Sequence, residues 1–120
     1  MNKTRIAAIE KEIQRVVSDL LLIEIKNPKL KLNDGMVSIV KTSLTGDARE
    51  CKIYISAYTN NSSLNKVKFQ KGLDEIKRFV RKRVSEELKL RYTPEIYLIL
   101  DDSIEQGIRI NQKINEINKV

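Results

Sequence analysis

The sequence predicts an α+β fold with the element order α-β-β-α-α-β-α. Apolar side chains recur at three- and four-residue spacing within residues 6–20 and 69–84, which is typical of amphipathic helices. Within residues 51–58 they alternate with polar side chains, which is typical of a half-buried strand. A chain of 120 residues is long enough to bury one core, and no repeat or linker divides it. We therefore expect one domain over residues 1–120.

Residues 1–26 are expected to form a long amphipathic helix. Three- and four-residue spacing places its apolar side chains on one face. The members of this stripe are Ile6, Ile9, Ile13, Val16, Val17 and Leu20. Asn27-Pro28 ends the helix, because a proline disfavours the helical conformation in the residue before it. The turn signal Asn33-Asp34-Gly35 follows.

Two strands are expected next, over residues 36–44 and 51–58, joined at Thr45-Gly46-Asp47 as an antiparallel hairpin. The alternation in the second strand puts Cys51, Ile53, Ile55 and Ala57 on one face and Lys52, Tyr54, Ser56 and Tyr58 on the other. We expect the two tyrosines to lie beneath a helix. Stacking of bases on them is the alternative, since single-strand readers use aromatic pairs on a sheet.

The second half of the chain begins with another helical stripe. Its members are Phe69, Leu73, Ile76, Val80 and Val84. Arg83 falls close to this stripe on a straight helix, which predicts a break near residues 83–85 and hence two consecutive helices. Residues 96–100 are apolar on both faces, which favours a central strand. A capping box at Ser103 then starts a last helix that carries Ile104, Ile108, Ile114 and Ile117.

Composition excludes several chemistries. The chain has no histidine and one cysteine, Cys51, so a histidine-dependent nucleophile, a disulfide within the chain and a zinc cluster are all excluded. No Gly-x-x-Gly, P-loop or dinucleotide fingerprint occurs. Glu10, Lys11 and Glu12 interrupt any signal peptide, and the longest apolar runs, 20–23 and 96–100, cannot span a membrane. We expect a cytoplasmic protein.

Positive charge is concentrated in one segment. The chain has a net charge of +7, and residues 65–92 hold ten basic against four acidic side chains. Lys71, Arg78 and Lys82 lie roughly opposite the apolar stripe of their helix. A solvated helix face is the simpler interpretation, but clustered Lys and Arg on one segment favour a polyanion as partner.

Five sequence blocks stand out by their order and spacing. They are residues 24–30, 37–40, 45–47 with 51–56, 88–96 and 101–110, and the most specific, 88–96, reads Leu-Lys-Leu-Arg-Tyr-Thr-Pro-Glu-Ile. Over most of the chain, these blocks resemble the ribosome-binding factor A family of small bacterial ribosome-assembly factors.

The resemblance implies a type II KH-like domain, a three-stranded sheet backed by helices. It also implies a non-enzymatic protein that binds the free 30S subunit and assists late maturation, including 5′-end processing of 16S rRNA. Family members are linked to growth in the cold. The family usually has an Ala-x-Gly kink between its second and third helices. Ile76-Lys77-Arg78 stands there in this chain, so a milder kink, or one displaced toward residues 83–85, is expected.

The leading hypothesis is thus a non-catalytic assembly factor whose partners are the 30S subunit and 16S rRNA. We expect it to be a monomer that needs no cofactor, metal or small-molecule substrate and does not bind a membrane. Its candidate RNA contacts are Lys71, Lys77, Arg78, Arg81, Lys82, Arg83, Lys89 and Arg91. Three alternatives stay open. They are a KH-like binder of another structured RNA, a hydrolase built on Asp101 and Asp102, and a basic helix that lies on a membrane surface.

Overall fold

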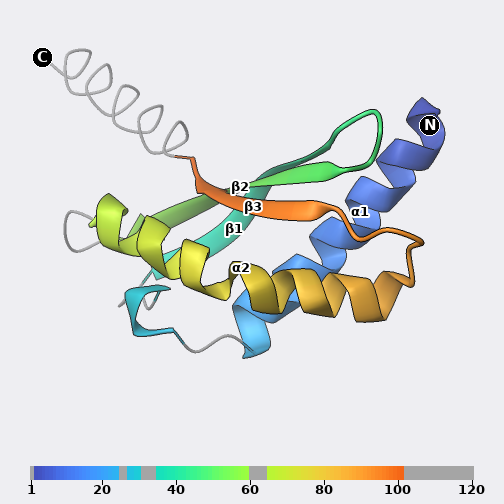
Figure 1. The fold of residues 1–120 in the computed structure, drawn as a ribbon. Coiled ribbons are helices and arrows are strands. Elements are labelled where there is room, and N and C mark those ends of the chain that lie inside the picture. Colours follow the sequence, from blue (N-terminus) through green and yellow to red (C-terminus); the bar gives the residue numbers. More distant parts are fainter. Residues whose placement is uncertain (1, 25–26, 31–34, 60–64, 102–120) are drawn as a thin grey trace, which may run out of the picture.

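The computed structural model describes residues 2–24, 27–30, 35–59 and 65–101. Strands β1 (Gly35–Leu44) and β2 (Glu50–Thr59) form an antiparallel hairpin, and β3 (Glu95–Leu100) pairs with β2 in parallel. Helices α1 (Lys3–Asp19) and α2 (Lys66–Leu88) lie on the same side of this sheet (Figure 1). The α+β class and the hairpin are confirmed, and the helix predicted over residues 104–117 lies outside the described residues.

The third strand is an edge of the described sheet, so the prediction of a central third strand is wrong. The strand order is β1-β2-β3, which makes β2 central. Ile96 and Leu98 are buried beneath the helices, while Tyr97 and Ile99 are half-buried on the other face. The Lys77 ammonium of α2 lies 4.4 Å from the centroid of the Tyr97 ring. β3 is therefore apolar on both faces because one face packs in the core and the other is partly covered, although the strand lies at the edge of the sheet.

Helix α1 begins where Asn2 accepts a hydrogen bond from the Arg5 backbone N–H at 2.8 Å, which satisfies one of the free donors of the first turn. After Asp19 the helix continues as a π-helical turn, Leu20–Glu24. Most of the predicted stripe is buried, with Ile13 and Val17 fully enclosed. The long amphipathic first helix is thus confirmed over its described length.

A short 3-10 helix, Pro28–Leu30, packs against α2 at Gly72. A Cβ atom on Gly72 would lie 2.8 Å from Leu30 Cδ2 and 2.9 Å from Lys29 Cβ, closer than carbon atoms approach without displacement. Glu75, one turn further along α2, forms an ion pair with Lys29 and accepts from Asn27 Nδ2 at 3.0 Å. The position favours glycine, because a Cβ atom there would have to displace the side chains of Lys29 and Leu30.

Helix α2 runs without interruption from Lys66 to Leu88, so the predicted break near residues 83–85 and the division into two helices are wrong. Arg83 is half-buried rather than excluded from the helix. A long arginine stem lies along apolar surface while its guanidinium stays in water, so a charge near the stripe does not require a break. The helix also shows no interruption at Ile76-Lys77-Arg78, where the family usually has its kink and a milder one was expected here, and Ile76 packs in the core.

Side chains of α2 form hydrogen bonds with backbone groups on the outer edge of β3 and in the two residues before it. Gln70 Nε2 donates to the Leu98 carbonyl at 2.8 Å, and Gln70 Oε1 accepts from the Leu100 N–H at 2.9 Å. Three turns later, Arg81 donates to the carbonyls of Thr93 and Pro94 at 3.2 and 3.3 Å. These bonds fix the position of α2 along the strand.

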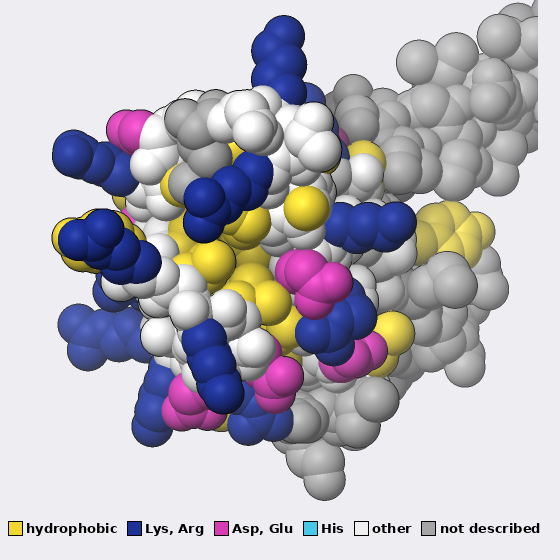
Figure 2. Space-filling view, turned by 90° about the vertical axis from the view of Figure 1, so that its right-hand side faces the viewer, with side chains coloured by type: hydrophobic (Ala, Val, Ile, Leu, Met, Phe, Trp, Pro, Cys, Tyr) yellow, Lys and Arg dark blue, Asp and Glu magenta, His cyan; other side chains and the backbone are white. Residues whose placement is uncertain are grey.

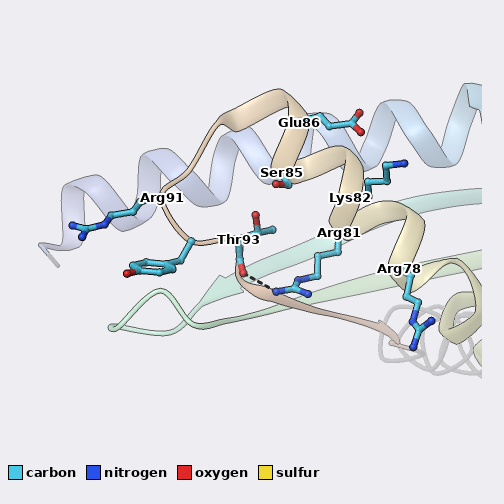
Figure 3. A pocket seen from close by; sticks show the side chains of 8 residues that line it. Arg78, Arg81, Lys82, Ser85, Glu86, Arg91 and Thr93 are labelled. Carbon is cyan, nitrogen blue, oxygen red and sulfur yellow. Dashed lines mark hydrogen bonds between the residues drawn. The ribbon is translucent and has the colours of Figure 1, made fainter.

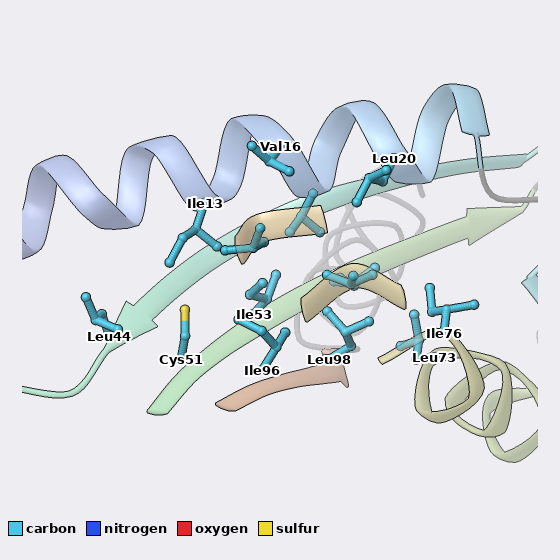
Figure 4. Close-up of a cluster of buried hydrophobic side chains, with 14 of the residues drawn as sticks. Ile13, Val16, Leu20, Leu44, Cys51, Ile53, Leu73, Ile76, Ile96 and Leu98 are labelled. Atoms are coloured by element: carbon cyan, nitrogen blue, oxygen red, sulfur yellow. The ribbon is translucent and has the colours of Figure 1, made fainter. Parts of the chain in front are cut away.

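One core lies between the helices and the sheet (Figure 4). It contains the predicted inner face of β2, with Cys51, Ile53 and Ile55 fully buried. On the opposite face Tyr54 is half-buried and Tyr58 is exposed, and neither α1 nor α2 covers them. The expectation that a helix lies over these tyrosines is therefore wrong for the two described helices.

Candidate nucleic-acid interface

A groove of about 770 Å³ lies between the second half of α2 and the loop that leads to β3 (Figure 3). Its lining residues are Arg78, Arg81, Lys82, Ser85, Glu86, Arg91, Tyr92 and Thr93. Four of them are cations and one is a carboxylate. Figure 3 shows Arg91 at one end of the groove and Arg78 at the other. This arrangement attracts an extended anion rather than a single small one.

The groove keeps its shape because the loop is held on both sides. The helix ends at Lys89, which adopts a left-handed conformation (φ 47°), and its N–H donates to the Ser85 carbonyl at 3.2 Å. Arg81 bonds the two carbonyls before β3, and Pro94 is fully buried. The side chains of residues 91–93 are therefore presented on an anchored segment.

Arg78 and Lys82 are the two cations of the groove best placed for phosphates. They stand one helical turn apart, and both side chains are exposed. Neither has a hydrogen-bond or ion-pair partner among the described residues. Their charges are not offset by a carboxylate within ion-pair distance, so both can neutralise an incoming phosphate.

Lys77 and Arg81 also face β3 and are partly offset there. The Glu95 carboxylate forms an ion pair with each of them, at 3.6 Å from Lys77 Nζ and 3.8 Å from an Arg81 Nη. The Lys77 ammonium also makes a cation–π contact with the Tyr97 ring. We therefore assign Lys77 to the packing of α2 on β3, whereas Arg81 serves both the packing and the groove wall.

The other predicted contacts are distributed more widely. Lys71 lines a second, smaller groove of about 410 Å³ with Lys66, Val67, Gln70, Asp74 and Leu100 at the start of α2. Arg83 is half-buried, and Lys89 is exposed at the end of the helix beside the groove without lining it. The structure thus brings together four of the eight predicted residues: Arg78, Arg81, Lys82 and Arg91.

Sequence reasoning missed the polar and aromatic part of the groove, namely Ser85, Glu86, Tyr92 and Thr93. Tyr92 is 76% exposed, more than any other large apolar or aromatic side chain in the described part of the chain. The sequence offered one indication of this exposure. Tyr92 lies in a short loop between the end of a helix and a proline, where no apolar periodicity places its ring in the core.

Figure 2 looks onto the end of the molecule formed by the α2–β3 loop, the hairpin turn and the start of α1. Lys and Arg side chains project around this end, with Asp and Glu side chains between them. No helix of the described ranges is apolar over a length that would cross a bilayer. A cluster of three or more metal-ligating side chains is likewise absent from those ranges.

Cys51 is poorly suited to act as a nucleophile. Its thiol lies within the core, and burial, assisted by the nearby negative charge of Glu10, raises its pKa to about 12. A thiol with this pKa is almost entirely protonated at neutral pH, and the thiolate is the reactive form. Of the pair Asp101 and Asp102, the second lies outside the described residues.

A basic groove on a small α+β domain is typical of proteins that bind a nucleic acid or a particle containing one. The family model described as Ribosome-binding factor A matches residues 5–114. A ribosome-binding factor A of Fusobacterium nucleatum is 40% identical, covering 98% of each chain. The chain therefore belongs to the ribosome-binding factor A family.

Solved structures show the same fold. The solution structure of a Thermotoga maritima protein assigned to this family superimposes with a TM-score of 0.67 at 29% identity, covering 88% of this chain and 95% of the other. A homology model of the Thermus thermophilus ribosome-binding factor A, fitted into a cryo-EM map of a 30S complex, gives a TM-score of 0.61 at 13% identity. It covers 81% of this chain and 96% of the other. At that identity the second likeness supports the fold alone.

Proposed function

We propose that this protein binds the free 30S ribosomal subunit through its basic groove and assists late maturation of the subunit, including 5′-end processing of 16S rRNA, without catalysing a reaction itself. The observation that carries the proposal is the groove with four cations on a member of this family. Ribosome-binding factor A of Thermus thermophilus is described in a 30S complex, and membership of the same family supports the same partner here.

In this mechanism the protein holds a conformation of the rRNA until maturation is complete and then leaves. Arg78 and Lys82 contact phosphates, with Arg81 and Arg91 on the groove walls. The remaining predicted cations, Lys71, Lys77, Arg83 and Lys89, add to the positive field of α2 and its end. Phosphate contacts position a protein but do not read sequence, so selectivity comes from the shape of the RNA.

The proposal includes the architecture that the resemblance implies, a single type II KH-like domain over residues 1–120 acting as a cytoplasmic monomer. The three-stranded sheet with both described helices on one side supports the KH-like assignment, although α2 is one helix where the family pattern implies two. No step in this function needs a cofactor or a small-molecule substrate.

Co-sedimentation with purified 30S subunits, 50S subunits and 70S ribosomes over a salt series tests the proposal. We expect selective pelleting with 30S subunits that weakens as salt rises, because bound cations displace counterions from RNA. Equal pelleting with all three particles would instead indicate a general binder of structured RNA, and pelleting with none would refute the proposal.

The double variant Arg78→Glu, Lys82→Glu tests the groove itself. We expect it to fold normally, to lose most of its 30S binding at moderate salt and to show a salt dependence weaker by about two phosphate contacts. The matched control, Lys41→Glu with Lys52→Glu, makes the same change of net charge on the sheet face away from the helices. Equal losses in both double variants would show that net charge, not the groove, drives binding.

A further inference from the structure

Tyr92 presents an unusually exposed aromatic ring at the groove. It is 76% exposed, and its hydroxyl has no hydrogen-bond partner among the described residues. A ring exposed to this degree adds little to the stability of the fold, because an aromatic side chain stabilises a protein mainly through the apolar area that it buries. By contrast, Phe79 and Tyr58 are much less exposed, at 45% and 41%.

The ring stands on an anchored segment. Arg81 donates to the carbonyl oxygens of Thr93 and Pro94, directly after Tyr92, and Pro94 is buried. On the other side Lys89 closes the helix end. Because the loop is already ordered, a ligand that contacts the ring does not have to immobilise the backbone, which favours binding.

Arg91 completes an aromatic platform. Its guanidinium carbon lies 5.5 Å from the centroid of the Tyr92 ring, within the range of a cation–π contact. A cation on one face polarises the ring and helps to hold its orientation. The high exposure of the ring leaves surface for a second flat, π-rich group to stack on it.

The cations that line the groove together with Tyr92 indicate which kind of ligand it binds. Arg78 and Lys82 are phosphate-binding cations without partners in the described chain, and they line the same groove as Tyr92. A strand with regularly spaced phosphates and splayed bases satisfies both features at once. In a duplex the bases are stacked on one another, so only the phosphates would be used.

We propose that Tyr92 stacks on an unpaired base of an RNA strand whose phosphates contact Arg78 and Lys82, so that the groove selects single-stranded over double-stranded RNA. This inference rests on the proposed function and specifies which part of the RNA the site takes. Base–aromatic stacking is tolerant of sequence, so the site recognises an accessible strand without reading its bases.

A single-tryptophan variant reports stacking directly. The chain contains no tryptophan, so Tyr92→Trp introduces one fluorophore at the proposed contact. We expect saturable quenching of its emission by a single-stranded oligoadenylate ten nucleotides long. A fully paired RNA duplex of equal length should produce little quenching. Equal quenching by both, or by neither, would overturn the inference.

Affinity measurements separate stacking from charge. Tyr92→Ala should weaken binding of the oligoadenylate about 5- to 100-fold and leave duplex binding nearly unchanged, whereas Tyr92→Phe keeps the ring and the affinity. Phe79→Ala, which removes an exposed ring of α2 that does not line the groove, is the matched control and should bind like the wild type. Equal weakening of single-stranded and duplex binding in Tyr92→Ala would assign the ring a role in shaping the loop and refute stacking.

Failure of this inference is distinguishable from failure of the proposed function. If Tyr92→Ala binds oligoadenylate like the wild type while Arg78→Glu with Lys82→Glu abolishes 30S pelleting, the stacking contact is refuted and the 30S function stands. If the wild type does not pellet with 30S subunits but stacks on oligoadenylate, the proposed function fails and a single-strand binder remains.

Discussion

The two halves of α2 are similar in sequence character but differ in what they contact. Residues 66–76 pack against Pro28–Leu30 and the end of β3, through Gly72, Glu75 and Gln70. Residues 77–88 carry five cations against two carboxylates and form one wall of the basic groove. Both halves thus bury apolar side chains in the core, but only the second half also presents cations of the groove to a partner. Charge density alone does not separate a docking surface from a binding surface, whereas the partners of each side chain do.

The comparison predicts that the first half is sensitive to volume. Gly72→Ala places a Cβ against Lys29 and Leu30, and overpacking of this kind costs up to about 3 kcal/mol, offset by about 1 kcal/mol of helix propensity. We expect the free energy of unfolding to fall by about 2 kcal/mol in urea titrations followed by circular dichroism. Gly46→Ala is the matched control, because a Cβ there meets nothing within 4 Å. A Gly72→Ala variant as stable as the wild type would mean that the 3-10 helix does not pack as described.

Two arginines of the second half sharpen the comparison further. Arg78→Ala and Arg81→Ala each remove one charge from the groove, so both should reduce the salt dependence of 30S binding by about one phosphate contact. Only Arg81 also donates to the Thr93 and Pro94 carbonyls, so only its loss should lower the free energy of unfolding, by about 1 kcal/mol. Equal stabilities of the two variants would contradict the dual role of Arg81.

The smallest expected effect concerns the acid in the first half. Hydrogen bonds from Asn27 and Lys29 hold the pKa of Glu75 below its usual value of 4.5. A carboxylate with a lowered pKa in the folded state stabilises the protein above its unfolded pKa, and this contribution disappears as pH falls through the folded pKa. Thermal melting should therefore show the wild type slightly more stable than Glu75→Gln at pH 7, with the difference shrinking as the pH falls below 4.5. A difference that stays constant on acidification would show that the carboxylate charge is not responsible.

Sequence patterns predicted which face of each helix or strand is buried, but they predicted less well which other elements it contacts. The alternation of Cys51, Ile53 and Ile55 identified the buried side of β2 because that side depends only on local periodicity. The edge position of β3 depends on which strand it joins, and local periodicity does not contain that information. The break expected at Arg83 was wrong because a helical wheel treats a long, amphipathic side chain as a point charge.

The candidate site divides in the same way. Arg78 and Lys82 could be predicted because their exposure follows from the phase of the apolar stripe on their own helix. The sequence could not show that Arg91 lines the groove whereas Lys77 does not. That distinction requires knowing that Glu95 and Tyr97 of β3 lie beside Lys77. Tyr92 was missed because loops have no period, and the position of its loop depends on bonds that Arg81 of α2 makes to the Thr93 and Pro94 carbonyls.

The side-chain amide of Gln70 has a consequence for behaviour at high concentration. An unpaired strand edge is a template on which another chain can add a strand, and this is a common origin of aggregation. On β3 the exposed N–H of Leu100 and carbonyl of Leu98 are already occupied by Gln70, and α2 lies along the edge. On the opposite edge the Leu44 N–H donates to Glu10, and an irregularity after Ile39 interrupts the register of β1. Both borders of the sheet thus disfavour growth by strand addition.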